Sequence, residues 1–574
     1  MSFIAFLTLV VGAVSLYADQ LAVRLGPLTM LGNIFEFCAI MLLGAEVIAR
    51  FLESPRGLPF LRAKMRFLAS GALLVAFFVA AKSLRLSFFG FDSSRYVIVL
   101  VILRSLYVLS GEIKRIRSLA LILERLRFHP ARTILLSFFL VIAVGAVLLM
   151  LPVCARGGKG LSFLNALFTA TSAVCVTGLT VVDTGTAFSF WGQLVILVLI
   201  QVGGLGIMIL TFSTVFVARR SVSVENKLLI SFMLSEDDMT QLRTTVLRII
   251  KITFGIELVG AALLFAGFSD SFGFTITTGF DALFHSISAF CNAGFALFPT
   301  SLIAYVNDPL VSGTIAMLII LGGLSFVVLI NIGQTLRDRV ANLMARKHSR
   351  IRRLTLNSKV VLAMTGILIS SGTLILYGTE HGNTLRSLPL GGQYLAAFFQ
   401  SVTLRTAGFN SIPFNALRGT TYLVMVLYMF VGGASGSTAG GVKVGAVAVV
   451  YSFVRAAFGA TRQPTLFRSS ISQENISRAM IVILFGLVTV GLGTLLLSIS
   501  EHDTTIQILF EATSAFGTVG LSTGITPTLS PFGKLIISIL MYIGRVGPLM
   551  ILSAAAQRRR KADIAFPTGE VSLG

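Results

Sequence analysis

Four short stretches of this sequence have the residue types that bind a metal cation through backbone oxygens. They read FTATSAVCVTGL, FHSISAFCNAGF, FFQSVTLRTAGF and FEATSAFGTVGL, and they begin at residues 168, 284, 398 and 510. Counted from the opening Phe as zero, each has a small or β-branched pair at positions four and five, Gly at ten, and Leu or Phe at eleven. The four glycines lie 116, 114 and 112 residues apart. This period predicts four copies of one structural unit.

Ion selection by carbonyl oxygens is the chemistry that suits these turns. An alkali cation gives up its hydration shell where other oxygens replace it, and the carbonyls of an extended turn supply them without a titratable charge. Gly at position ten permits conformations closed to other residues. Ordinary helix-to-helix turns are the alternative, but they do not explain the common Phe frame. We predict that four turns line one pore, with these filter residues: Val176, Thr177, Gly178, Asn292, Ala293, Gly294, Thr406, Ala407, Gly408, Thr518, Val519 and Gly520.

The composition places these turns in a bilayer. Of the 574 residues, 55% are hydrophobic and 12% are charged, against roughly 45–50% and 25% in soluble domains. The cysteines lack metal-binding or disulfide spacing, which predicts buried thiols. The sequence shows no Ser/His/Asp, HExxH or paired-Asp constellation at matching membrane depth, so a membrane enzyme is disfavoured.

The net charge of +22 follows the membrane topology. Four candidate cytoplasmic segments hold 22 Lys or Arg: 219–251, 337–359, 455–478 and 558–561. Four segments on the opposite side hold 5: 154–189, 268–308, 379–419 and 500–530. This asymmetry predicts that both termini are cytoplasmic. Aromatic residues are not interleaved with the basic ones, which argues against a nucleic-acid partner, while a specific acidic lipid or partner stays open.

Four apolar stretches precede the first repeat, each near the roughly 17–25 residues that cross a bilayer. They are about 3–17, 28–49, 67–83 and 96–111. The first lacks a basic leading region and a clear cleavage site, so a retained membrane helix is expected in place of a signal peptide. Glu36, Glu46 and Arg104 leave a voltage-sensor-like block open. A peripheral packing domain with one buried ion pair is the plainer interpretation, because a sensor needs several gating charges on one helix.

Each repeat is expected to contain an apolar helix, a re-entrant half-helix, the turn and a second apolar helix. The half-helix is too short to span, and irregular backbone at membrane depth survives where it lines a cavity or is buried in protein. The first helices are expected at about 133–152, 245–267, 357–378 and 478–499, and the second at about 190–218, 309–335, 420–455 and 531–556. The prediction is thus an all-α membrane protein with a pseudo-fourfold pore and these domains: 1–127, 128–220, 221–340, 341–456 and 457–574.

Two irregular second helices are candidates for the gate. The third contains GGASGSTAGG, with Gly432, Gly433, Gly436, Ser437, Gly440 and Gly441 as gate residues. Five glycines at about 1 kcal/mol each disfavour a continuous helix, which predicts a loop. Tight helix packing through glycines at spacing four is the alternative.

The second helix of the fourth repeat contains Arg545, which is costly in a bilayer unless it meets water or partners. It is expected to face the cavity, contact loop carbonyls near residues 435–438 and repel cations. The alternative is a structural Arg paired elsewhere.

Three polar residues near the turns have simpler roles. Arg405, at position seven of the third turn, would block a cation pathway if it pointed inward. It is expected to anchor the turn from behind, with Glu511 as its partner. His285 and His381 lack metal-ligand spacing and are interpreted as ordinary polar residues.

Residues of about 128–560 resemble the superfamily of potassium transporters that includes bacterial Trk and Ktr membrane subunits and plant HKT proteins. The first turn, SAVCVTGLTVVDTG at residues 172–185, is most similar to the Ktr type, KtrB. The resemblance implies a four-repeat potassium pore, a membrane homodimer and a cytosolic ring of nucleotide-binding regulatory subunits resembling KtrA and TrkA. Some sodium-passing plant relatives carry Ser at the first filter glycine, so Gly178 favours potassium. The four leading helices depart from the eight-helix Ktr pattern.

The predicted function is potassium uptake through this gated pore, driven by the membrane potential. The protein is expected to be multi-pass, in the plasma membrane of a bacterium, with K⁺ as the transported ion, Na⁺ as a possible activator and nucleotide acting only through the regulatory partner. The alternative is a sodium- or proton-coupled secondary carrier. Such a carrier is expected to show inverted repeats, whereas these four repeats share one orientation.

Overall fold

The computed structural model describes residues 87–88, 91–92, 130–158, 160–218, 242–345, 353–459 and 463–555. The chain divides into two compact units. The smaller comprises Met1–Phe128, Val147–Ala166 and Thr186–Val195, and the larger comprises His129–Ala146, Leu167–Gly185 and Ile196–Gly574. All four turns lie in the larger unit. The four helices predicted over residues 3–111 lie outside the described residues.

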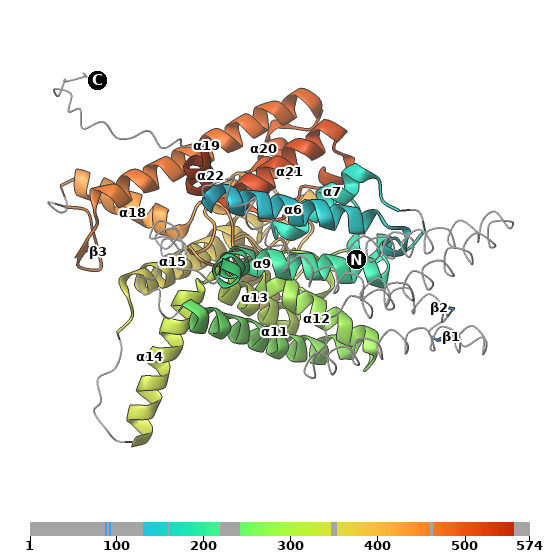
Figure 1. The fold of residues 1–574 in the computed structure, drawn as a ribbon, viewed down its shortest axis with the longest axis horizontal. Coiled ribbons are helices and arrows are strands. Elements are labelled where there is room, and N and C mark those ends of the chain that lie inside the picture. The colour runs from blue at the N-terminus through green and yellow to red at the C-terminus, as the bar shows by residue number, and fades with distance from the viewer. Residues whose placement is uncertain are drawn as a thin grey trace, which may run out of the picture. The chain divides into compact units, whose positions relative to one another are not determined.

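The described chain is almost entirely helical (Figure 1). Its helices are α6 (Pro130–Met150), α7 (Phe163–Val174), α8 (Thr184–Ala187), α9 (Phe190–Ala218), α11 (Leu242–Phe272), α12 (Ile276–Phe290), α13 (Pro309–Gly323), α14 (Phe326–Ala345), α15 (Leu356–Glu380), α16 (Leu390–Thr403), α17 (Gly419–Phe430), α18 (Val444–Ala457), α19 (Gln473–Ser500), α20 (Thr505–Gly517), α21 (Pro531–Val546) and α22 (Pro548–Ala555). The expected all-α composition needs a small correction, because two antiparallel hairpins are present. They pair β1 (Ser87–Phe88) with β2 (Phe91–Asp92), and β3 (Thr465–Leu466) with β4 (Ser469–Ser470).

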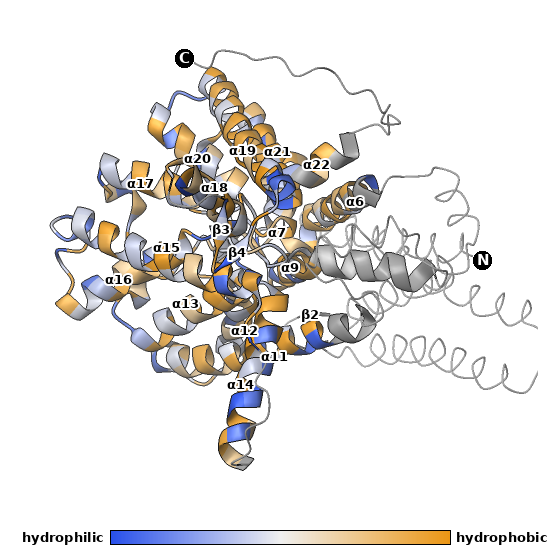
Figure 2. Cartoon of the chain, turned by 90° about the vertical axis from the view of Figure 1, so that its left-hand side faces the viewer, coloured by the Kyte–Doolittle hydropathy of each residue, from blue (hydrophilic) through white to orange (hydrophobic). Residues whose placement is uncertain are grey.

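Three of the described helices are each long and apolar enough to cross a membrane: Arg248–Phe272 within α11, Leu356–Glu380 and Gln473–Ser500. A helix of about 25 residues is about 37 Å long, which exceeds the hydrocarbon thickness of about 30 Å. Hydrophobic side chains remain exposed on their outer faces, such as Leu258, Leu374 and Leu495. Figure 2 shows hydrophobic residues along much of α19 and α21. The protein is therefore a multi-pass membrane protein with lipid-facing helices.

A short helix precedes each of the four turns. The short helices α12, α16 and α20 pack against the long helices α11, α15 and α19 respectively. With α7 they have 12–15 residues, and at 1.5 Å per residue such helices are about 18–22 Å long, too short to cross the bilayer. They begin five to eight residues before the marker Phe.

Burial of the residues at the two ends of each stretch, positions zero and eleven, explains the shared Phe frame. Phe168, Phe284 and Phe510 are fully buried, and in the third copy the neighbouring Phe399 is buried in place of the marker. The apolar residues at position eleven are also buried: Leu179, Phe295, Phe409 and Leu521. The frame therefore holds each turn inside the unit from both sides.

Three of the predicted second helices are interrupted. The third is divided between α17 and α18, as predicted, so the alternative prediction of a continuous, tightly packed helix is wrong there. The second was predicted as one helix over 309–335, but α13 and α14 are bent by 105° at a break after Gly323. The fourth was predicted over 531–556, but Gly547 separates α21 from α22 with φ of 88°.

Candidate ion filter and gate

The four turns share an unusual backbone conformation. Position eight of each is left-handed, with φ of 49° at Val176, 57° at Asn292, 68° at Thr406 and 50° at Thr518. Left-handed backbone is a genuine outlier for β-branched residues, and three of these four are β-branched. Such strain persists only where the surrounding structure enforces it, and it clusters at functional sites.

The glycines at position ten are also left-handed, and the turns meet through them. The φ values are 92°, 70°, 76° and 90° in chain order. A Cβ added at any of these glycines would lie within 2.7 Å of the position-nine carbonyl oxygen of the next turn. The distances are 2.5 Å from Gly178 to Ala293 O, 2.7 Å from Gly294 to Ala407 O, 2.7 Å from Gly408 to Val519 O and 1.9 Å from Gly520 to Thr177 O. The order closes on itself, so the four turns form a ring of touching backbones.

Serine at position four fixes three of the turns. The carbonyl oxygens of Ser172, Ser288 and Ser514 each accept a hydrogen bond from the position-nine N–H of the same turn, at 2.7–2.8 Å. In the first and fourth turns the serine hydroxyl also accepts from the glycine N–H, at 3.0 and 3.1 Å. The third turn has Val402 at this position, so it lacks that hydroxyl. The ring is therefore fourfold in outline but not in detail.

Glu511 supports the fourth turn, but it does not pair with Arg405 as predicted. Its buried carboxylate accepts hydrogen bonds from Ser522 Oγ, from Thr523 N at 3.0 Å and from Thr526 Oγ1 at 3.0 Å. It is therefore committed to the segment that follows its own turn. Arg405 is buried, and its Nε and Nη2 have no hydrogen-bond partner among the residues that the structure describes. The pairing prediction is wrong because nearer hydroxyl and N–H donors occupy the carboxylate.

His285 has a structural role that the sequence did not reveal. Its ring is fully buried in α12, where Nδ1 donates to Asp281 O at 2.7 Å and Nε2 accepts from Leu297 N at 3.3 Å. It stacks on Phe298 with ring centroids 4.6 Å apart. The side chain thus ties the short helix to the segment after the second turn. His381 is exposed, caps the end of α15 and stacks on Tyr377 with ring centroids 5.7 Å apart.

The glycine-rich segment forms a loop against the filter turns. Its two ends are joined, because Gly432 N donates to Val442 O at 2.8 Å and Val444 N donates to Gly433 O at 3.1 Å. A Cβ added at Gly440 would lie 2.2 Å from Thr518 Oγ1, and one added at Gly432 would lie 3.5 Å from Thr406 Cγ2. The loop therefore touches position eight of the third and fourth turns. We call residues 431–443 the gate loop.

Arg545 contacts the gate loop, as predicted. The side chain is buried, and its Nη1 donates to the carbonyl oxygen of Thr438. Its Nη2 donates to the carbonyl oxygens of Gly203 and Gly204 in α9. The guanidinium therefore joins the loop to α9 by three charge-assisted hydrogen bonds. A partner remote from the loop, the alternative interpretation, does not account for the Thr438 contact.

The side-chain roles of two polar loop residues were missed in the sequence. Thr438 is fully buried, and its Oγ1 donates to Gly322 O at 2.9 Å. Lys443 ends the loop, where Nζ donates to Ala439 O at 2.6 Å and Gly440 O at 3.3 Å. A lone Lys directly after a glycine run in an apolar span was the available signal. Thr438 carried no comparable signal, because its partners lie more than 100 residues away.

The break between α13 and α14 is occupied by the same loop. Gly322 O also accepts from Thr438 N at 3.3 Å, and Gly323 O accepts from Ala434 N at 3.1 Å. On the other side of the break, Phe326 N donates to Gly436 O at 3.4 Å. The loop thus satisfies backbone groups that a helix end leaves open, which is why the helix can stop at Gly323.

The site has no conventional metal-binding cluster. Within the described ranges, no group of three or more His, Cys, Asp or Glu could hold a metal ion. The oxygens that the four turns bring together are backbone carbonyls, which suit a cation in transit. The fold and this arrangement define a membrane protein of the cation-transport class.

The comparison with known families agrees with that class. The TrkH family, described as a cation transport protein, matches residues 113–561. The chain belongs to this family, which confirms the resemblance drawn from the turns. It is a family of transporters and not of enzymes.

Curated relatives match nearly their whole length. The chain is 38% identical over 455 residues to the Ktr system potassium uptake protein B of Bacillus subtilis, covering 79% of this chain and 98% of the relative. It is 35% identical over 457 residues to the potassium/sodium uptake protein NtpJ of Enterococcus hirae, covering 78% and 98%. The crystal structure of the potassium transporter TrkH from Vibrio parahaemolyticus shares the fold, with a TM-score of 0.60, 16% identity and coverage of 84% of this chain and 96% of that one.

Proposed function

We propose that this protein takes up potassium through a gated pore whose filter is the ring of four turns. One observation carries the proposal: each filter glycine lies against a carbonyl oxygen of the next turn, and the four contacts form a closed cycle. Rings of backbone carbonyls are the established device for replacing the hydration shell of potassium. The names of the relatives, potassium uptake proteins of two bacteria, support the choice of ion.

The proposed filter uses positions eight to ten of each turn. Position-nine carbonyls lie beside the neighbouring glycine, and the left-handed residues at eight and ten shape the backbone on either side. The residues are Val176, Thr177 and Gly178; Asn292, Ala293 and Gly294; Thr406, Ala407 and Gly408; and Thr518, Val519 and Gly520. The four helix/half-helix/helix repeats then surround one pseudo-fourfold pore. The four proposed domains after residue 127 each contain one of these repeats: 128–220, 221–340, 341–456 and 457–574.

The gate loop and Arg545 form the proposed gate. The loop touches the third and fourth turns, and Arg545 holds it through the Thr438 carbonyl. A buried positive charge next to a cation pathway is an electrostatic barrier. Opening requires the loop to leave this position, and the membrane potential then drives potassium inward.

The remaining features of the proposal concern assembly and location. We propose a homodimer in a bacterial plasma membrane, with both termini cytoplasmic and membrane lipids around it. The name of the first relative, a Ktr system protein B, supports a cytosolic nucleotide-binding partner of the KtrA or TrkA kind. Sodium enters either as an activator or as a second transported ion, since one relative is a potassium/sodium uptake protein. A sodium- or proton-coupled carrier is the competing mechanism.

Ion flux into vesicles that contain the purified protein tests the filter. Gly178→Ser places a Cβ 2.5 Å from Ala293 O on a residue with φ of 92°, so we expect at least a tenfold loss of rubidium over sodium preference, about 1.4 kcal/mol. Gly313→Ser is the control, because an added Cβ there meets nothing within 4 Å. Unchanged preference in Gly178→Ser would refute the filter. Flux that requires a sodium or proton gradient would favour the carrier.

A further inference from the structure

The helix α14 leaves the other helices of the larger unit and extends to the side (Figure 1). Two residues separate its start from the end of α13, and the two helix axes differ in direction by 105°. If α13 lies near the membrane normal, α14 lies near the membrane plane. A segment that continued into the cytosol would not need this bend.

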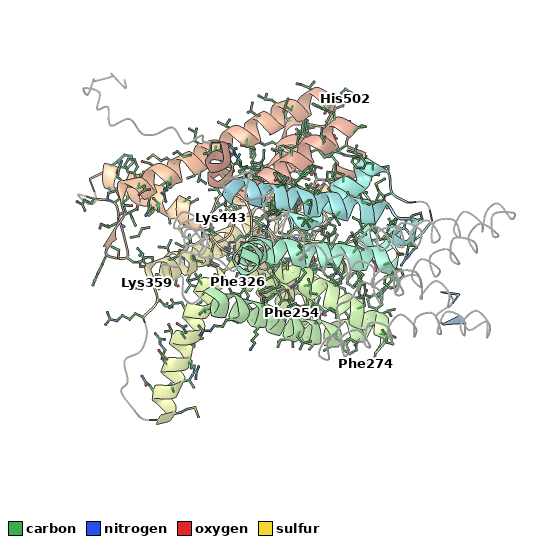
Figure 3. The ribbon with its side chains drawn as sticks, viewed as in Figure 1. Phe254, Phe274, Phe326, Lys359, Lys443 and His502 are labelled. Atoms are coloured by element: carbon green, nitrogen blue, oxygen red, sulfur yellow. The ribbon has the colours of Figure 1, made fainter. Side chains whose placement is uncertain are left out.

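Asn331 shows the depth at which α14 lies. Its Oδ1 accepts hydrogen bonds from Thr355 N at 3.1 Å and from Ser358 Oγ at 2.9 Å. Thr355 is the N-cap of α15, whose 25 residues form a complete apolar span. Lys359 is exposed in the first turn of α15 and is labelled in Figure 3. The α14 helix therefore passes the end of a membrane span, at the boundary between hydrocarbon and water.

One face of α14 is an exposed hydrophobic stripe. Leu336, Val340, Leu343 and Met344 are 54%, 50%, 79% and 83% exposed. Their spacing of four, three and one residues places all four within about 100° of the helix circumference. Figure 2 shows both hydrophobic and hydrophilic residues along this helix. We call these four residues the α14 stripe.

The α14 stripe faces the same way as the buried part of the helix. Leu329 and Ile332, which share its face at helical spacing, pack on a cluster that includes Val361 of α15 and Ala434 of the gate loop. Those partners belong to the membrane-embedded unit. Because the stripe continues this face, it is directed toward the bilayer side and not away from it.

Basic residues border the stripe. Arg337 and Arg339 are exposed and fall at its two edges by helical spacing. In the sequence, Arg346, Lys347 and Arg350 follow shortly after the helix. An apolar stripe with arginines beside it is the pattern of a helix that lies in the headgroup region of anionic lipid.

We propose that α14 docks on the cytosolic leaflet as an interfacial helix, with the α14 stripe in the acyl chains and its basic residues on anionic headgroups. The docked helix is joined to the gate loop, since the loop binds the carbonyls of Gly322 and Gly323 and the N–H of Phe326 at the start of α14. A change in lipid contact at α14 is therefore expected to change the position of the gate loop. Only this second step rests on the proposed gate.

Lipid-borne quenchers test the docking without any ion flux. Cys154, Cys175 and Cys291 are buried, so single reporters can be added once Cys38 is replaced by Ser. In vesicles with about one quarter phosphatidylglycerol, we expect a bimane at Leu343→Cys to be quenched at least about threefold more by doxyl lipid than one at Ala341→Cys, and less by aqueous iodide. Ala341 is the matched control because it is exposed on another face of the same helix.

Equal quenching at the two sites would overturn the proposal. So would protection of the Leu343→Cys reporter from both lipid and iodide, since that result would mean that a second copy or a cytosolic subunit covers the stripe. The charge component is tested with Arg337→Gln/Arg339→Gln, which we expect to lower doxyl quenching at least about twofold in anionic vesicles and little in neutral ones. Arg386→Gln, on the opposite side of the membrane by the charge pattern, is the control.

Flux measurements test the connection to the loop. Leu343→Glu/Met344→Glu is expected to change rubidium flux at least about threefold relative to Ala341→Glu, because charge is expelled from the acyl region. If the quenching experiment shows that the stripe is docked, unchanged flux in the double variant would refute the connection to the loop and leave the filter proposal standing. Loss of flux in the unmodified protein would instead count against the proposed function, while the quenching result would remain valid.

Discussion

At the residue scale, Thr438 joins the gate loop to two other parts of the chain. Its hydroxyl donates to Gly322 O in α13, and its carbonyl accepts from Arg545 in α21. Both contacts are buried, and a buried polar group that loses its last partner is destabilising. Such a group costs about 1–3 kcal/mol. The resting position of the loop therefore depends on few side chains.

Thr438→Val is expected to raise regulator-independent flux about tenfold, because it removes the hydroxyl bond worth about 1–1.5 kcal/mol and keeps the side-chain shape. Rubidium uptake by vesicles without any cytosolic partner measures the change. Thr494→Val is the control, since that hydroxyl bonds only to Val490 O in its own helix. Equal uptake by the two variants would contradict the role of Thr438.

Arg545→Gln is expected to increase uptake further, since it removes both the charge and the contacts to Thr438, Gly203 and Gly204. Arg545→Lys keeps the charge but cannot form the same forked contact. If charge alone closes the pore, Lys should retain low uptake. If the forked contact is required, both variants should show raised rubidium uptake in the same vesicle assay. Uptake by the Gln variant as low as that of the parent would exclude Arg545 from the gate.

The residue scale is also where prediction from sequence was least complete. The four glycines were identified from their common Phe frame and regular spacing, and Arg545 because a charge within an apolar helix is costly. Glu511 and Arg405 were paired on chemical type alone, whereas Glu511 binds Ser522, Thr523 and Thr526 close to it in the chain. Charge complementarity therefore predicted the wrong partner, because local hydroxyl and N–H donors compete equally well for a carboxylate.

At the element scale, helix interruptions place the loop under the turns. The break between α17 and α18 was predictable, since its glycines are concentrated in ten residues. The break after α13 was not, because Gly322 and Gly323 alone resemble a tolerated pair within an apolar helix. Their carbonyls are satisfied by a loop more than 100 residues later in the chain. Hydrophobic periodicity therefore located the spans, while the bends required tertiary contacts.

Glu380 holds the end of α15 to the start of α17 and supplies a stability prediction. Its buried carboxylate accepts from Arg418 N at 3.0 Å, from Asn383 Nδ2 at 2.7 Å and from Thr421 Oγ1. Glu380→Gln is expected to cost about 2 kcal/mol, since the amide replaces one charged acceptor with a donor. The transition temperature in detergent should fall by several degrees.

The matched control for Glu380 is Glu474→Gln. Glu474 forms an exposed ion pair with Arg478 one helical turn away, and such pairs contribute about 0.3–0.5 kcal/mol. We expect almost no change in the transition temperature of that variant. Similar shifts in both variants would show that Glu380 does not fasten the two helices.

At the scale of the whole molecule, the charge asymmetry of the loops predicts which ends of the helices face the cytosol. Phe274 and Lys359 lie at opposite ends of the larger unit in Figure 3. Phe274 follows α11 in a segment without Lys or Arg, and Phe467 lies in the β3–β4 turn among basic residues. Both side chains are exposed.

Membrane-impermeant thiol reagents test this orientation. In a Cys38→Ser background, Phe274→Cys is expected to react in intact cells and Phe467→Cys only after the membrane is opened. The parent should label weakly, because its three other cysteines are buried. The reverse pattern would invert the predicted topology and place α14 on the outer leaflet.

The ring of turns has a further consequence because one polypeptide supplies all of its corners. In a channel built from identical subunits, a single codon change alters every corner at once. Here Val402 replaces the serine of the other copies in one corner alone, and the Asn292 amide lies 3.3 Å from Thr406 Oγ1 across one boundary only. In the filter that we propose, ion preference can therefore be adjusted at one corner at a time, and the coordination shell can be asymmetric without any change in subunit stoichiometry.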